Sequence, residues 1–229
     1  TLAREGAELG IICIAVTLVL ILGRLDISVG STMAVSAMIM IIGFKTFEIH
    51  WGFLIILCIL FGFLVGLING YLSAIIGIPS FIATLGTLIL LRGLLQWAAA
   101  TDWMRDANSI FSEDENFLFI GNGDLFGIIP LSLFFMVIIF ILVLLFLNFT
   151  KIGTSIYALG GNFQSALRAG IRVKLIEVGV FTFTGICAAI AGIFLASRLD
   201  SVTYQTGQYL EFQVLIAVIL GGTSIAGGI

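Results

Sequence analysis

This sequence of 229 residues has little charge and almost no proline or histidine. Charged residues make up 10% of it and hydrophobic residues 60%, with two prolines and one histidine. Soluble domains carry about 25% charged residues, and a soluble core of this size could not bury so much apolar surface. The composition therefore excludes a soluble domain and predicts an integral membrane protein.

The residues of common enzyme and metal sites are equally scarce. The single histidine, His50, lies beside Trp51 at the end of an apolar segment, and Cys13, Cys58 and Cys187 lack metal-ligand spacing. No glycine-rich phosphate loop and no serine–histidine arrangement occurs, and basic residues are not clustered enough for nucleic acid. The sequence thus predicts no enzyme, no metal site and no nucleic-acid partner. Uphill transport would draw its energy from an ion gradient or a separate ATPase.

Apolar segments separated by polar ones predict an all-α fold, a polytopic helical bundle in the lipid bilayer. The segments are residues 7–23, 31–44, 51–76, 79–100, 131–149, 176–197 and 209–220. A membrane-spanning helix needs about 20 apolar residues, so the second and the last segments are too short to cross unaided. Irregular backbone at membrane depth survives only where protein or water satisfies its polar groups. The short segments therefore favour an internal path, with a tilted short helix or local thinning as the alternative.

Glycines recur at four-residue spacing in one long segment, as Gly62, Gly66 and Gly70. This spacing places them on one face of a helix. Small residues allow helices to approach closely in a membrane. We therefore predict a helix-packing seam at these glycines, with no chemical role.

Two polar segments of opposite charge predict the orientation. Residues 150–175 hold four basic residues and no acidic one, whereas residues 101–130 hold six acidic residues and one arginine. Basic loops remain cytoplasmic, so we expect residues 150–175 inside and residues 101–130 outside. The long external loop is a candidate surface for an external partner.

Polar residues near the apolar segments need an explanation, because a charge at the membrane centre costs about 2.5–3.5 kcal/mol on insertion scales. Asp26 either pairs with Arg24 or, with Ser28, caps the helix that follows. Arg92 either extends to the outer interface or faces inward, and Glu211 either complements a helix dipole or faces inward. If they face inward, Asp26, Ser28, Arg92 and Glu211 line a translocation path.

A polar island at residues 157–171 interrupts the apolar pattern. Asn162 is a typical helix N-cap and Gly170 a typical C-terminal stop, so we predict a short cytoplasmic coupling helix over residues 162–170. We expect apolar Phe163 and small Ser165 and Ala166 to enter a groove on a soluble partner. The predicted docking residues are Gly160, Gly161, Asn162, Phe163, Gln164, Ser165, Ala166, Arg168 and Gly170.

Four blocks of the sequence resemble the permease subunits of bacterial sugar-type ABC importers, the ribose, galactose, xylose and autoinducer-2 group. The blocks are residues 25–31 (LDISVGS), 78–93, 157–171 and 218–228, in the family's order. The third block is similar to the family's ATPase-docking loop. It departs from the pattern because Phe163-Gln164-Ser165-Ala166 stands where ABC importers often have Glu-Ala-Ala. Arg24-Leu25 also replaces the glycine that often precedes Ile-Asp.

The resemblance implies a single permease domain over residues 1–229, a fragment lacking the family's first helix and its C-terminal helices. It implies a homodimer or heterodimer in the bacterial inner membrane that imports a monosaccharide or similar small polar solute. An extracytoplasmic binding protein would deliver the solute, and cytoplasmic ATP-binding subunits would bind ATP and Mg. The chain itself would bind no cofactor and catalyse no reaction. From the residues alone, an ion-coupled secondary transporter and a channel remain alternatives.

Overall fold

The computed structural model describes residues 2–109, 112, 114–224 and 227. Every predicted apolar segment forms a helix. These helices are α1 (Leu2–Ile21), α2 (Val29–Lys45), α3 (Trp51–Gly70), α4 (Ser80–Ala99), α7 (Leu131–Phe149), α10 (Val173–Leu199) and α11 (Leu210–Leu220). Four helical segments in the described residues are long and apolar enough to cross a membrane: Trp51–Ile76, α4, α7 and α10. The prediction of a helical membrane protein with additional short helices is confirmed.

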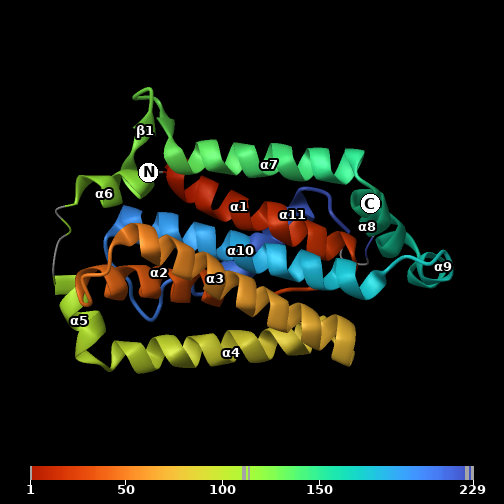
Figure 1. Ribbon diagram of the computed structural model, residues 1–229, viewed down its shortest axis with the longest axis horizontal. Helices are drawn as coiled ribbons and strands as arrows, with labels where there is room; N and C mark the ends of the chain where they lie inside the picture. Colours follow the sequence, from red (N-terminus) through yellow and green to blue (C-terminus); the bar gives the residue numbers. More distant parts are fainter. Residues whose placement is uncertain (1, 110–111, 113, 225–226, 228–229) are drawn as a thin grey trace.

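Helix α10 lies at the centre of the bundle, between α1 and α3 (Figure 1). Its middle is rich in small buried residues, such as Ala188, Ala189 and Ala191, which allow neighbouring helices to approach it closely. The outer helices expose large apolar side chains instead, among them Phe140 and Leu142 of α7. We infer that these outer faces contact lipid tails.

The glycines of α3 pack directly against α10. A Cβ atom on Gly62 would overlap the carbonyl oxygen of Gly185, and one on Gly66 would overlap the carbonyl oxygen of Phe181. On Gly70 it would lie 2.8 Å from the Cα atom of Val178. Only glycine permits this backbone-to-backbone approach. Gly185 completes the seam from the α10 side.

Helix α3 continues without a break into a π-helical segment, η1 (Tyr71–Ile76). The segment ends at Gly77, whose φ of +89° is easily adopted only by glycine. Two buried polar residues, Asn69 and Ser73, lie at this transition. Such wide turns often occur at functional sites.

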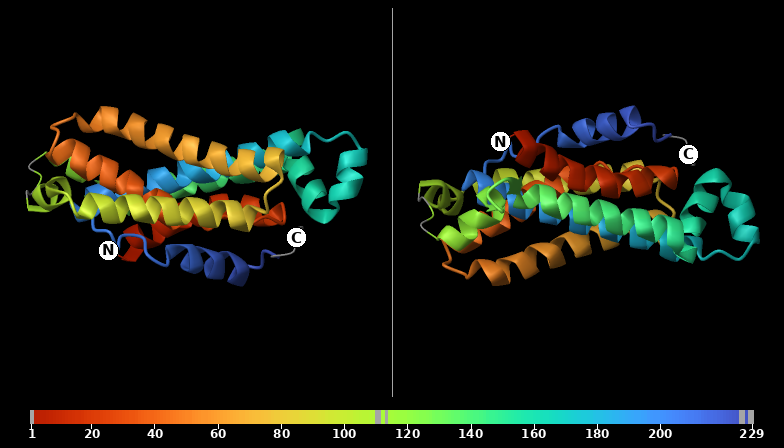
Figure 2. Two further views of the ribbon diagram at one scale, coloured as in Figure 1. Left: turned by 90° about the horizontal axis from the view of Figure 1, so that it is seen from below. Right: turned by 90° about the horizontal axis from the view of Figure 1, so that it is seen from above.

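The two polar segments lie at opposite ends of the bundle (Figures 1 and 2). One end, which we call the hairpin end, carries α5 (Asp102–Ser109), α6 (Glu115–Asn122) and the antiparallel pair β1 (Asp124–Leu125) and β2 (Ile129–Pro130). The other, the α9 end, carries α8 (Lys151–Gly161) and α9 (Phe163–Arg168). Helices α5, α6 and α8 were not predicted. Glu113 of the acidic segment and Ile225, Ala226 and Gly228 of the last block lie outside the described residues.

Candidate functional site

The segment between α1 and α2, residues 22–28, is not helical, yet its second part, residues 26–28, is buried inside the bundle. Hydroxyl groups of α4 accept hydrogen bonds from its backbone: Leu25 N–H donates to Ser80 Oγ (3.1 Å), and Ile27 N–H to Thr84 Oγ1 (3.3 Å). Backbone polar groups at membrane depth need such protein partners. We call this segment the first break.

A chain of side-chain hydrogen bonds connects the first break to α3 and α4. Thr87 Oγ1 donates to Asn69 Oδ1 (2.6 Å), and Asn69 Nδ2 donates to Ser28 Oγ (2.9 Å). Ser28 in turn donates to Asp26 Oδ1 from its hydroxyl (2.7 Å) and its backbone N–H (2.9 Å). Asp26 is only 2% exposed. Its carboxylate therefore organises the start of α2 through Ser28 and, among the described residues, forms no ion pair.

Arg24 pairs with α10 and not with Asp26, so the local ion pair that the spacing allowed is absent. Arg24 Nε lies 3.0 Å from Glu177 Oε1, and Ser73 of η1 donates to the same carboxylate oxygen (2.6 Å). At the opposite end of α10, Arg198 pairs with Glu8 of α1 at 2.7 Å. Ion pairs thus connect α10 to α1 at one end and to the residues just after α1 at the other.

A second break, residues 200–209, separates α10 from α11, and Arg92 of α4 holds it in place. The Arg92 guanidinium donates to the carbonyl oxygens of Thr206 (2.7 Å) and Gly207. Arg92 therefore faces inward and does not extend to the outer interface. A planar guanidinium suits two adjacent carbonyl groups because its donors have a fixed fork geometry.

The start of α2 meets the second break at a pair of glycines, Gly30 and Gly207. A Cβ atom on Gly207, whose φ is +63°, would lie 2.7 Å from the carbonyl oxygen of Gly30. One on Gly30 would lie 2.8 Å from both Gly207 O and Glu211 Oε2. The start of α2 therefore touches the end of the second break, and glycine is required on both sides.

Glu211 is the least satisfied polar group at this contact. Its side chain is buried at the start of α11, and its Oε2 atom accepts no hydrogen bond within the described part of the chain. It interacts electrostatically with Arg92, which offsets part of the cost of burying a charge. Gly30 contacts Gly207 and lies near Glu211, and Arg92 donates to Gly207. Because Gly30 is only two residues from Ser28, which binds Asp26, the residues Asp26, Ser28, Arg92 and Glu211 all lie around the start of α2. We call this set the polar junction.

The predicted short helix exists as α9, and its ends follow from local sequence. Asn162 Oδ1 accepts a hydrogen bond from Ser165 N–H (2.9 Å), as an N-cap does. At the other end Gly170 has a φ of +77°. Gly170 N–H donates to Leu167 O (3.1 Å) and Ile171 N–H donates to Ala166 O (3.2 Å). This pair of bonds is the Schellman motif of a helix C-terminus.

One of the predicted docking residues of α9 faces the interior of the chain and not a partner. Ala166 is 4% exposed and packs inside the chain with Leu159 and Val173, so it cannot enter a groove on a partner. Phe163 and Leu167, four residues apart, are 44% and 52% exposed. Sequence reasoning missed Leu167, although its spacing from Phe163 was the available signal. Gly161, Gln164, Ser165, Arg168 and Gly170 are also exposed, and Gly160 is half-buried.

The bundle, with four described helical segments long and apolar enough to cross a membrane, is that of a multi-pass membrane protein. Residues 1–229 match the protein family described as the permease component of the branched-chain amino acid transport system. The chain belongs to this family.

Curated relatives support the predicted resemblance to sugar-type ABC permeases. The ribose import permease protein RbsC of Haemophilus influenzae is 36% identical over 98% of this chain and 68% of the relative. The autoinducer 2 import system permease protein LsrC of Yersinia enterocolitica is 34% identical over 95% of this chain and 58% of the relative. The chain thus spans about three fifths to two thirds of the length of these relatives. No solved structure matches it.

Proposed function

We propose that this chain is the transmembrane permease subunit of an ABC importer in the bacterial inner membrane. It would carry a monosaccharide or similar small polar solute, delivered by an external binding protein. The observation that carries this proposal is α9, a capped helix at one end of the bundle whose Phe163 and Leu167 side chains are exposed. In a family of transport permeases, an apolar pair on a helix outside the bundle is suited to docking a soluble subunit.

The polar junction is the proposed lining of the solute path. Hydroxylated solutes need hydrogen-bonding partners when they leave water, because unpaired polar groups are costly in an apolar medium. The free Glu211 Oε2 is an acceptor for such a hydroxyl group. Arg92 and Asp26 hold the two breaks beside it. Opening the path would require the Gly30–Gly207 contact to separate.

A packed cluster offers a mechanical route from α9 to the first break. Ala166 of α9 contacts a cluster that contains Leu159 of α8 and Val173 of α10, with Leu22 of the first break against it. A displacement of α9 by a partner would therefore move the start of α10 and the first break together. ATP and Mg would be bound by the cytoplasmic partner, whose hydrolysis cycle would supply the energy.

Two further partners complete the proposal. A second permease subunit would pair with this chain, and the external binding protein would dock at the hairpin end, where acidic residues such as Asp102 and Asp106 are exposed. The choice between ribose, autoinducer 2 and other small polar solutes would depend largely on that binding protein.

The test is retention of the ATP-binding subunit by full-length permease variants. Leu167→Asp and Phe163→Asp place a charge on the proposed docking face, and we expect each to lose the subunit in co-purification from membranes. Phe126→Asp is the matched control, because Phe126 is 94% exposed at the hairpin end, and it should retain the subunit. Retention by all three variants would contradict the docking role of α9.

A further inference from the structure

Glu177 is the residue at which α10, the first break and η1 are bound together. Its buried carboxylate forms a two-point pair with Arg24, because Arg24 Nε lies 3.0 Å from Oε1 and Arg24 Nη2 donates to Oε2 (3.2 Å). Ser73 of η1 also donates to Oε1 (2.6 Å). Other elements therefore engage both carboxylate oxygens, and the two parallel contacts fix the orientation of the pair.

A second polar connection closes a ring around these elements. Asn69 lies four residues before Ser73 in the continuous helix formed by α3 and η1, so the two side chains lie on the same face. Ser73 binds Glu177, whereas Asn69 binds Ser28 at the far end of the first break. The first break is thus attached twice, through Arg24 to α10 and through Ser28 to α3. We call this arrangement the polar ring.

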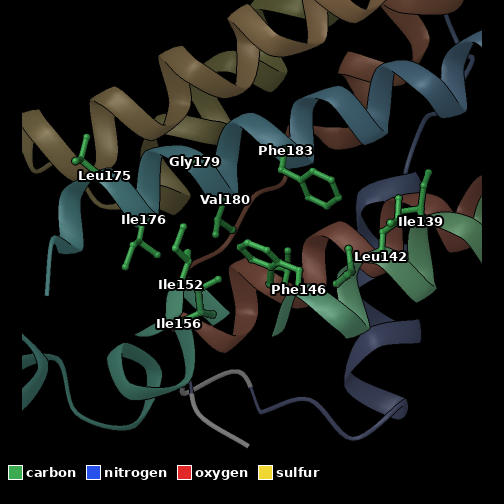
Figure 3. A pocket seen from close by; sticks show the side chains of 12 residues that line it. Ile139, Leu142, Phe146, Ile152, Ile156, Leu175, Ile176, Gly179, Val180 and Phe183 are labelled. Carbon is green, nitrogen blue, oxygen red and sulfur yellow. The ribbon is translucent and has the colours of Figure 1, made fainter. Parts of the chain in front are cut away.

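Glu177 is also the only polar attachment of the first part of α10. Within residues 173–183, all of which the structure describes, no other side chain forms a hydrogen bond or ion pair with another element. Elsewhere on its surface this part of α10 borders an apolar cavity of about 610 Å³, which Ile176, Val180 and Phe183 line (Figure 3). Polar contacts therefore join the start of α10 to other elements through Glu177.

The start of α10 is connected to α9 by apolar packing. Val173 lies in a buried cluster with Ala166 of α9 and Leu159 of α8. Val173 and Glu177 are four residues apart and therefore lie on one face of α10. A displacement of α9 would reach Glu177 over a single helical turn.

We propose that Glu177 is a positioning residue for transport, which makes the first break and η1 move with α10 when the ATP-binding subunit displaces α9. This inference rests on the proposed function. Separating a buried carboxylate from its partners is strongly unfavourable, so the first break follows α10. The movement reaches Gly30, two residues after Ser28, and so acts on the contact between Gly30 and Gly207.

The test compares the ATP hydrolysed with the solute imported by reconstituted full-length permease, the proposed ATP-binding subunit and the proposed binding protein. The solute is the one that mass spectrometry identifies in the purified binding protein. Glu177→Gln offers one acceptor oxygen where Arg24 uses two, so the two-point pair is lost at nearly constant volume. We expect this variant to hydrolyse about fivefold more ATP for each imported molecule, the lower end of typical coupling between sites.

Glu8→Gln is the matched control. Glu8 and Glu177 are both 4% exposed, and Glu8 pairs with Arg198 at the opposite end of α10. Among the described residues this pair connects α10 only with α1. The variant should leave the ratio of ATP to solute unchanged, because a purely structural loss lowers hydrolysis and uptake together.

The two partners of Glu177 test the polar ring. Arg24→Gln and Ser73→Ala should each raise the ratio of ATP to solute. The double variant Arg24→Gln/Glu177→Gln should raise it no further than Glu177→Gln alone, since both changes remove the same pair. Should Glu177→Gln fail to fold, Ser73→Ala decides, because it removes only one hydroxyl group.

An unchanged ratio in Glu177→Gln, or in both Arg24→Gln and Ser73→Ala, would overturn the role of Glu177 and leave the proposed function intact. Absence of ATP-driven uptake by wild-type protein would instead contradict the proposed function, and this inference with it.

Discussion

At the scale of single residues, the most unusual feature is the interaction of half-buried Arg92 with buried Glu211. A charge at membrane depth is costly, and this pair offsets that cost in two ways. The Arg92 guanidinium donates to two carbonyl groups of the second break. The Glu211 carboxylate interacts electrostatically with the same guanidinium. Neither residue could be interpreted from its own sequence neighbourhood, because their contacts join segments more than 100 residues apart.

This arrangement predicts strong coupling between the two residues. Arg92→Leu leaves the Glu211 carboxylate buried without compensation, whereas the double variant Arg92→Leu/Glu211→Leu removes both charges. We therefore expect the double variant to lose less stability than the sum of the two single variants, by about 0.5–3 kcal/mol. Unfolding in detergent–denaturant titrations measures the three losses. Additive losses would show that the side chains do not interact.

At the scale of elements, the seam between α3 and α10 depends on small side chains. Gly66→Leu should destabilise the protein by about 1–3 kcal/mol, because the new side chain would overlap the α10 backbone at Phe181. Gly86→Leu on α4 is the control, since its Cβ atom would meet nothing within 4 Å. Thermal unfolding in detergent compares the two variants. Equal melting temperatures would mean that α3 can move away from α10 at no cost.

The elements also show which parts of the fold the sequence could predict. Helix α9 was predictable because its caps, Asn162 and Gly170, act on residues only a few positions away. Helix α8 was missed, although Thr150 caps it and Ile152, Ile156 and Leu159 follow helical spacing. In the sequence, the two breaks were indicated only by the short apolar segments that follow them, residues 31–44 and 209–220. Their partners, such as Glu177 for Arg24, are set by how distant helices pack, which a single sequence does not specify.

At the scale of the whole molecule, the opposite ends of the bundle should face opposite sides of the membrane. Asn116 in α6 and Ser165 in α9 are both exposed and lie at the two ends. Single cysteines introduced at these positions should react with a membrane-impermeant maleimide from opposite sides, with residue 116 external. The unsubstituted protein measures the background labelling, because Cys58 and Cys187 are buried but Cys13 is only half-buried. Labelling of both positions from one side would refute the proposed orientation and the docking of a cytoplasmic subunit at α9.

The central claim is that this chain is the permease of an ATP-driven importer. Measuring which energy source drives uptake tests that claim most directly. Full-length permease, the proposed ATP-binding subunit and the proposed external binding protein would be placed in right-side-out proteoliposomes, with the solute that the binding protein retains. We predict uptake only when ATP is enclosed, and loss of that uptake in Leu167→Asp. Uptake driven by a sodium or proton gradient, without ATP or the ATP-binding subunit, would contradict the account and identify an ion-coupled transporter instead.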